Sequence, residues 1–172
     1  FYKKHMLSVD QVAELLKMIP EEKKISFDRE FADKLYLEYN ERQQYNDADV
    51  VEALKKEFEG KEILLLAPGR HLADADEEIK KMLSDDHYAS IALNNYKLYE
   101  TDYVLATKQD IFEESRAQGR RMILTSNVCE QSDDHTKVID YKKWTKVGDG
   151  VNDAAVVIVF NLLKTLGTTH VY

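Results

Sequence analysis

The chain has 172 residues, of which 44% are hydrophobic and 33% charged, and its formal net charge at pH 7 is −8. This acidic balance excludes nonspecific nucleic-acid binding, which needs a basic face to neutralise phosphates. No apolar run approaches the roughly 20 residues of a membrane span, and no signal-peptide core is visible. The single cysteine, Cys129, rules out an intrachain disulfide. We therefore expect a cytoplasmic protein with no membrane or nucleic-acid partner.

Residues 1–60 have a helical character and form a predicted linker or extension. Ser8 is a suitable N-cap for a helix from Val9 to Met18, and Pro20 lies just past that pattern. A second helical period runs from Phe27 to Tyr45. A third, short helix is predicted from Asp49 to Phe58 and is stopped by Gly60.

Residues 61–172 alternate strand and helix signals, which predicts a Rossmann-like α/β domain with a mostly parallel sheet and helices on both faces. The predicted strands are Ile63–Ala67, Tyr88–Leu93, Tyr103–Ala106, Met122–Thr125, Lys137–Asp140 and Thr169–Tyr172. The predicted helices are Ala73–Leu83, Asp110–Gln118 and Val151–Leu166, the last ended by Gly167. Because the chain starts at Phe1 and a strand breaks off at Tyr172, we expect it to be a piece of a longer protein.

The helix Val151–Leu166 is almost wholly apolar, so it is predicted to be buried nearly all round. Its cover would be the domain itself, a missing domain or a second copy in a homo-oligomer. Asn152 or Asp153 is expected to cap its N terminus, in preference to binding a metal or a ribose.

The loop after the first strand, Pro68-Gly69-Arg70-His71, is the first candidate site, because parallel sheets bind ligands at the carboxyl ends of their strands. Gly69 allows close backbone approach, and Arg70 offers donors to a phosphate or carboxylate. Against this interpretation, neither a G-x-G-x-x-G pattern nor a P-loop is present, and a plain turn explains the loop equally well.

Polar residues also follow the next three strands. Asn94 ends the second strand, Lys108 follows the third, and Ser126 and Asn127 follow the fourth. Each residue alone is best explained as part of a turn, but their shared sheet edge makes a joint ligand site equally plausible. No histidine has metal-ligand spacing with another histidine or with Cys129, so no metal site is predicted and no cofactor is identified.

Several segments resemble the region that follows the barrel in bacterial HMG-CoA lyase-like proteins of the 4-hydroxy-2-oxovalerate aldolase type. They include residues 3–9, 19–23, 35–39, 64–69, 91–94, 101–104, 124–127, 153–155 and 162–167. The resemblance implies an accessory α/β domain of a lyase, whose catalytic barrel would be a missing N-terminal partner. A barrel of this type takes about 250 residues, so this chain does not contain it. The accessory domain would sense a ligand or support assembly.

The loop Pro68-Gly69-x-x-Leu72 with Asn94 is also similar to nucleotide-binding loops of sialyltransferase-like and hydroxymethylpterin pyrophosphokinase-like domains. This chain departs from their Gly-Pro-Ser-Leu pattern, because Arg70-His71 replace the Pro-Ser pair. Two alternatives therefore stand beside a lyase accessory domain that binds an anionic or nucleotide-like ligand. One is a nucleotide-sugar or pyrophosphate transferase with His71 as its general base. The other is a structural or oligomerisation module.

Overall fold

The computed structural model describes residues 9–18, 30, 44–68, 72–94, 98–148 and 150–172. Their contacts divide the chain into two units, Phe1–Gln44 with Lys146–Asn152, and Tyr45–Thr145 with Asp153–Tyr172. The described part of the first unit contains helix α1 (Val9–Lys17) and an antiparallel pair of short strands, β6 (Lys146–Val147) and β7 (Gly150–Val151). The predicted N-cap Ser8 and nearly all of the predicted helix from Phe27 to Tyr45 lie outside the described residues.

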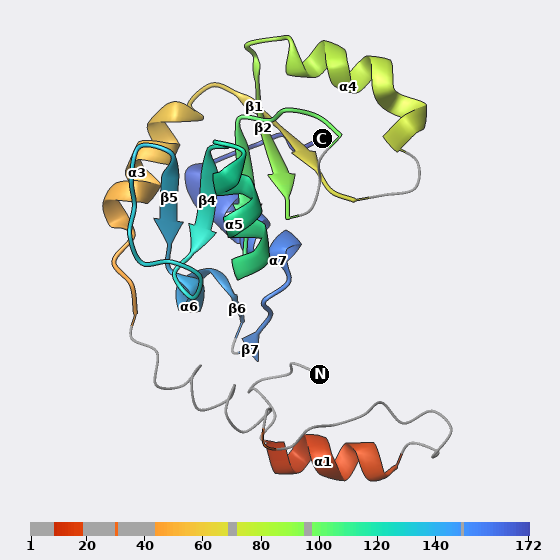
Figure 1. Ribbon diagram of the computed structural model, residues 1–172, viewed down its shortest axis with the longest axis vertical. Coiled ribbons are helices and arrows are strands. Elements are labelled where there is room, and N and C mark those ends of the chain that lie inside the picture. Colours follow the sequence, from red (N-terminus) through yellow and green to blue (C-terminus); the bar gives the residue numbers. More distant parts are fainter. Residues whose placement is uncertain (1–8, 19–29, 31–43, 69–71, 95–97, 149) are drawn as a thin grey trace. The chain divides into compact units, whose positions relative to one another are not determined.

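The second unit is built on a parallel sheet of five strands whose spatial order follows the chain (Figure 1). The strands are β1 (Glu62–Leu66), β2 (Tyr88–Leu93), β3 (Tyr103–Ala106), β4 (Met122–Thr125) and β5 (Thr136–Ile139). They are short, continuous apolar runs, which is typical of strands covered on both faces. The predicted α/β class is thus confirmed.

Both edges of this sheet have partners in the chain. At the β1 edge, Val171 forms a parallel bridge with Ile63, and the N–H groups of Ile63 and Leu65 donate to the carbonyls of His170 (3.1 Å) and Tyr172 (2.9 Å). At the β5 edge, the N–H of Val138 donates to the hydroxyl of Ser132 at 3.1 Å. These bonds use backbone groups that would otherwise invite pairing with another chain.

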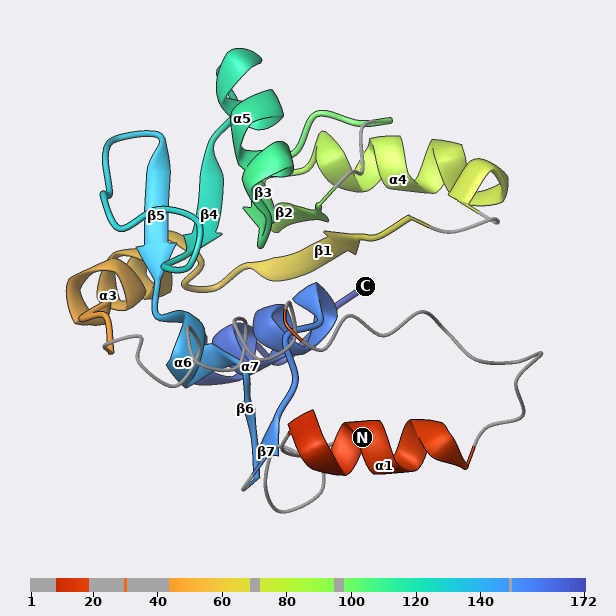
Figure 2. The ribbon, with the colours of Figure 1, turned by 60° about the horizontal axis from the view of Figure 1, so that its bottom comes forward.

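Two layers of helices cover the sheet (Figure 2). Helices α4 (Asp76–Leu83) and α5 (Gln109–Ala117) lie on one face, where they pack on strand residues such as Leu64 and Leu124. The other face carries α3 (Ala48–Glu57), α6 (Tyr141–Trp144) and α7 (Ala155–Leu166). Successive strand residues alternate between the two cores, since side chains along a strand point to opposite faces.

Most predicted elements lie within two residues of the observed bounds, and the predicted ranges of β2, β3 and β4 match the structure. The predicted helix Ala73–Leu83 divides into a 3₁₀ turn, Leu72–Ala75, and α4. The predicted last strand is reduced to the single bridge at Val171. Gly167 ends α7 with φ 82°, a left-handed conformation that glycine adopts without strain, as predicted.

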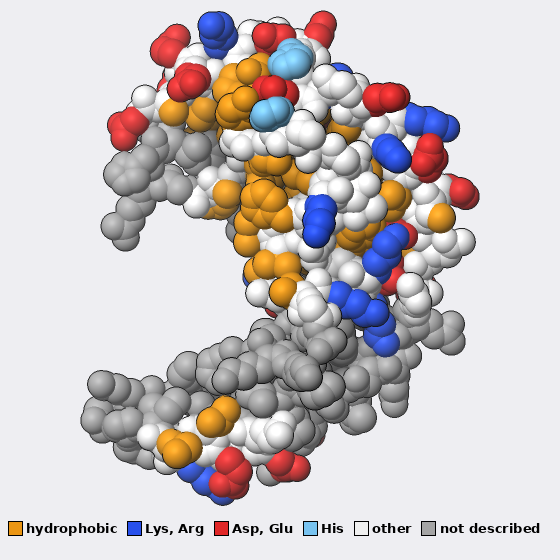
Figure 3. All heavy atoms as spheres, turned by 180° about the vertical axis from the view of Figure 1, so that it is seen from behind, with side chains coloured by type: hydrophobic (Ala, Val, Ile, Leu, Met, Phe, Trp, Pro, Cys, Tyr) orange, Lys and Arg blue, Asp and Glu red, His pale blue; other side chains and the backbone are white. Residues whose placement is uncertain are grey.

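The predicted start of α7 is wrong. The helix begins at Ala155 with Ala154 as its N-cap, so neither Asn152 nor Asp153 caps it, and Val151 belongs to β7. Within this chain α7 is covered on one flank only, because Val156 and Phe160 are 44% and 48% exposed, so cover of the other flank by a missing domain or a second copy stays a prediction. Seen from behind, hydrophobic side chains gather on the described surface with charged ones around them (Figure 3). One flank of α7, which includes Ile158 and Leu162, suffices to cover the sheet.

Candidate functional site

Two predicted strand-end residues, Asn94 and Asn127, are linked by hydrogen bonds through Thr107. The backbone N–H and the hydroxyl of Thr107, just after β3, donate to Oδ1 of Asn94 at 3.3 and 3.4 Å. The side-chain amide of Asn127, after β4, donates to the carbonyl of Thr107 at 3.5 Å. The structure therefore brings Asn94 and Asn127 to one edge, through a residue whose linking role the sequence did not reveal.

Asn94 is held in an orientation that matters for binding. Its φ is 49°, a left-handed value that asparagine tolerates better than most residues. Because Oδ1 already accepts from Thr107, the hydrogen bonds assign the NH₂ end of the amide as the part that remains to donate. Asn94 also lines a cavity.

This cavity has a volume of about 280 Å³ and lies at the carboxyl edge of the sheet. Its walls are formed by Pro68, Leu93, Asn94, Lys108, Asp110, Ile111 and Ala155. Residues from the first turns of two helices, α5 and α7, are thus among its walls. Pro68, Asn94 and Lys108 belong to the strand-end loops that the sequence predicted as candidate sites. Asp110 was not predicted as a site residue, and Ala155 was missed because the start of α7 was misplaced.

The helix N-termini make this end of the unit favourable for negative charge. Lys108 is the N-cap of α5 and Ala154 that of α7, and neither side chain caps its helix. The first turn of α7 contains no acidic residue, whereas α5 has Asp110, whose carboxylate accepts from the N–H of Ile111 at 3.0 Å. Lys108 is exposed and adds a positive charge.

The remaining predicted site residues have other positions. Gly69, Arg70 and His71 lie outside the described residues, so the first candidate loop has no structural account. Ser126 is buried, and its hydroxyl accepts from the N–H of Tyr141 at 3.1 Å. This bond fixes the start of α6 to the end of β4, and Ser126 is not part of the cavity wall.

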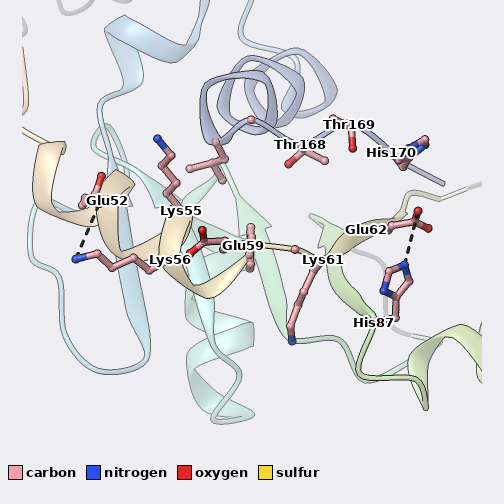
Figure 4. Close-up of a pocket in the computed structure, with 14 residues that line it drawn as sticks. Glu52, Lys55, Lys56, Glu59, Lys61, Glu62, His87, Thr168, Thr169 and His170 are labelled. Carbon is pink, nitrogen blue, oxygen red and sulfur yellow. Dashed lines mark ion pairs between the residues drawn. The ribbon is translucent and has the colours of Figure 1, made fainter.

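A larger hollow of about 620 Å³ lies at the opposite, amino-terminal side of β1 (Figure 4). Lys55, Lys56 and Lys61 line it, but their ammonium groups point in different directions (Figure 4). Three glutamates share the hollow; Glu52 pairs with Lys56 at 3.9 Å, and Glu62 pairs with His87 at 3.7 Å. The positive and negative charges of this hollow therefore balance, and its ammonium groups do not converge on one point, so the hollow is poorly suited to an anion.

A third hollow, of about 710 Å³, lies where β3 begins and α5 ends. Its two arginines are already bonded within the protein. Arg120 donates to the hydroxyl of Thr101 at 3.1 Å, and Arg121 pairs with Glu57 at 2.7 Å. Of the three cavities, the smallest one thus has the best arrangement for an anionic ligand.

A buried carboxylate supports the β5 side of the same sheet edge. Asp47, just before α3, accepts hydrogen bonds from the N–H of Asp140 (3.0 Å), the ammonium of Lys143 (2.8 Å) and the indole of Trp144 (2.5 Å). Burial raises the pKa of Asp47, but these three donors outweigh burial and hold the pKa below its ordinary value. The carboxylate is therefore ionised at neutral pH and anchors α3 to α6.

Within the described ranges, no three histidine, cysteine, aspartate or glutamate side chains are grouped to hold a metal ion. The sulfur of Cys129 accepts from the N–H of Gln131 at 3.5 Å, and its half-buried side chain packs against the core on the α4–α5 side of the sheet. Across the same ranges, none of the helices has both the length and the apolar character needed to span a membrane.

No family model matches the sequence, and neither a curated protein nor a solved structure shows a significant match to the chain. The geometry of the site and the chemistry of its side chains are thus the basis for a function.

Proposed function

We propose that this domain binds a compact anionic ligand, with a phosphate or a nucleotide-like group, in the cavity between the first turns of α5 and α7. The observation that carries the proposal is the entry of both helix N-termini into the walls of one cavity, together with Lys108. Each N-terminus acts as a partial positive charge, and the lysine contributes a full one.

The hydrogen bonding of the wall also favours an acceptor-rich ligand. Asn94 presents its NH₂ donors because Thr107 occupies its oxygen. Asp110 is the one acidic side chain in this wall, and its contact with the N–H of Ile111 offsets part of its charge. A volume of about 280 Å³ is near the lower limit of ordinary ligand pockets, so a mononucleotide or smaller molecule fits better than a dinucleotide.

The biological setting that we propose follows from the sequence resemblance to aldolase-type lyases. In that setting the domain is an accessory module, and the carbon–carbon bond chemistry belongs to a separate barrel. Binding at the sheet edge would then report the presence of an anionic metabolite or nucleotide to the barrel. The transferase alternative depends on His71, which lies outside the described residues, and the site gives it no further support.

A second candidate function is an interaction module, favoured by the outer flank of α7. Val156 and Phe160 are four positions apart, so they lie on the same side of the helix, and both are more than a third exposed. Analytical ultracentrifugation of the chain and of a Phe160→Ser variant tests this function. A self-association constant that falls in the variant supports an interface, and an unchanged monomer argues against one.

The first function is tested by thermal-shift and calorimetric titration with inorganic phosphate, nucleoside monophosphates, sugar nucleotides and acetate. A ligand at about 100 times its dissociation constant adds roughly 2.7 kcal/mol of stability. Lys108→Gln should abolish most of this shift, and Asp110→Asn should increase it because a negative charge leaves the wall. Lys164→Gln, on the exposed side of α7, is the matched control. If no anion shifts the transition, or if Lys108→Gln behaves like Lys164→Gln, the proposed site is wrong.

A further inference from the structure

Three buried oxygen atoms have no hydrogen-bond partner among the residues that the structure describes. They are Oγ1 of Thr125, Oδ1 of Asn127 and Oδ2 of Asp140. Buried polar groups in proteins are nearly always paired, so an unpaired one calls for a water, an ion or another explanation. These three are the complete set of such side-chain atoms in the described ranges, and all three are able to accept.

All three belong to one corner of the sheet. Thr125 is the last residue of β4, and Asn127 follows within a turn closed by a 2.9 Å bond from the N–H of Val128 to the carbonyl of Thr125. Asp140 is the first residue after β5, and the two strands are paired there, with Thr125 beside Ile139. The corner is therefore formed by the carboxyl ends of two neighbouring strands.

Asp140 is the charged member of the set, and it is fully buried. Its Oδ1 accepts from the N–H of Lys142 at 3.1 Å and so caps α6, which leaves Oδ2 without a donor. No described lysine, arginine or histidine forms an ion pair with Asp140. The nearby ammonium of Lys143 is paired with Asp47 instead, at 2.8 Å.

The charges of this corner are consequently unbalanced. Asp47 and Asp140 are both buried, and the backbone N–H of Asp140 donates to Asp47 at 3.0 Å. Lys143 supplies one positive charge for these two carboxylates. A buried carboxylate without a counter-charge is strongly unfavourable, and a water molecule supplies hydrogen bonds but no charge.

We propose that a hard, oxygen-coordinated cation binds at this corner, held by the carboxylate of Asp140, the hydroxyl of Thr125 and the amide oxygen of Asn127. Carboxylate, hydroxyl and amide oxygens are ligands that hard cations prefer. None of these residues lines the cavity assigned to the anionic ligand, and neither Asp140 nor Thr125 belongs to the hydrogen bonds of Thr107 that orient Asn94, so variants of these two residues test the cation site by itself.

The experiment measures the melting temperature of the full chain in NaCl, KCl, MgCl₂ and CaCl₂ against tetramethylammonium chloride at equal ionic strength. One of the four ions should raise the melting temperature by about 5 °C or more at about 100 times its dissociation constant. Fluorescence of Trp144, the single tryptophan, follows the same titration because this residue lies one helical turn after Asp140.

Asp140→Asn is the decisive variant, because asparagine keeps the cap on α6 and removes the charge. It should lose the ion-dependent rise, whereas Asp134→Asn, an exposed neighbour, should keep it. Thr125→Val preserves shape and should weaken ion affinity by about 10-fold or more. This second variant also provides the test if Asp140→Asn does not fold. Equal melting temperatures in all salts, or an ion effect that survives in both variants, would overturn the proposal.

Discussion

The carboxylate of Asp47 accepts a hydrogen bond from the indole nitrogen of Trp144, a residue 97 positions later, and each residue is only 3% exposed. This contact joins the segment before α3 to the last residue of α6. The helix that precedes the sheet in the chain is thereby tied to its far edge.

The pH dependence of stability should reflect this contact. The pKa of Asp47 in the folded protein lies below its ordinary value of 3.8, so its contribution is present above pH 3.8 and is lost as the pH falls through the folded value. Asp47→Asn should lower the free energy of unfolding at pH 7 by about 2 kcal/mol. In this variant the further loss of unfolding free energy below pH 4 should be smaller than in the wild type. Urea denaturation at several pH values measures both effects. Asp49→Asn, at an exposed position, should change neither.

Tyr103 should make the free energy of unfolding depend on pH in the alkaline range. Burial and a 2.8 Å hydrogen bond to Glu57 raise the pKa of Tyr103 above its ordinary value of 10.0. The unfolded chain therefore loses this proton first, and stability should fall as the pH rises above 10. Tyr103→Phe should reduce that slope, whereas Tyr45→Phe should keep it. Equal slopes in wild type and Tyr103→Phe would contradict the assignment.

Thr107 should control ligand affinity although it does not line the cavity. Thr107→Val removes the hydroxyl that donates to Asn94 at 3.4 Å while keeping the size of the side chain. The amide of Asn94 is then less firmly oriented, and we expect affinity for inorganic phosphate to fall by about 3- to 10-fold. Thr107→Ser should retain it. Calorimetric titration measures the affinity, and an unchanged value in Thr107→Val would show that the backbone N–H of Thr107 suffices.

The two flanks of α7 should respond differently to truncation. Leu162 is fully buried, so Leu162→Ala should cost about 2–5 kcal/mol of unfolding free energy. Phe160 is 48% exposed, and Phe160→Ala should cost less than about 1 kcal/mol. Chemical denaturation of both variants checks the difference. A large loss from Phe160→Ala would mean that this side chain is covered in solution.

The sequence predicted the sheet well because its signals are local. Ile91, Leu105 and Ile123 belong to short apolar runs bounded by polar residues, and such runs identify buried strands wherever they pack. The order of the strands was not predicted, since no local pattern specifies which strand is the neighbour of which. The shared edge of Asn94 and Asn127 followed from the parallel topology alone.

The failures have physical reasons too. The apolar run from Val151 to Leu166 predicted burial nearly all round, but no local pattern tells which body covers each flank, and within this chain the flank of Phe160 is exposed. The N-cap of this helix was predicted wrongly, because Asn152 and Asp153 are good capping residues in general, whereas the helix begins further along the chain, at Ala155. The roles of Thr107 and Asp140 were not predicted, because they depend on contacts with distant parts of the chain.

The bridge between Ile63 and Val171 has a consequence for the order of folding. The five strands pair with their immediate successors, so each such pairing closes a short segment of chain. The contact at β1 joins residues from the beginning and the end of the described α/β unit, and it carries a larger loop-closure entropy. It should therefore form last and open first. Amide hydrogen exchange should then be faster at Ile63 and Leu65 than at Val104 in the middle of the sheet.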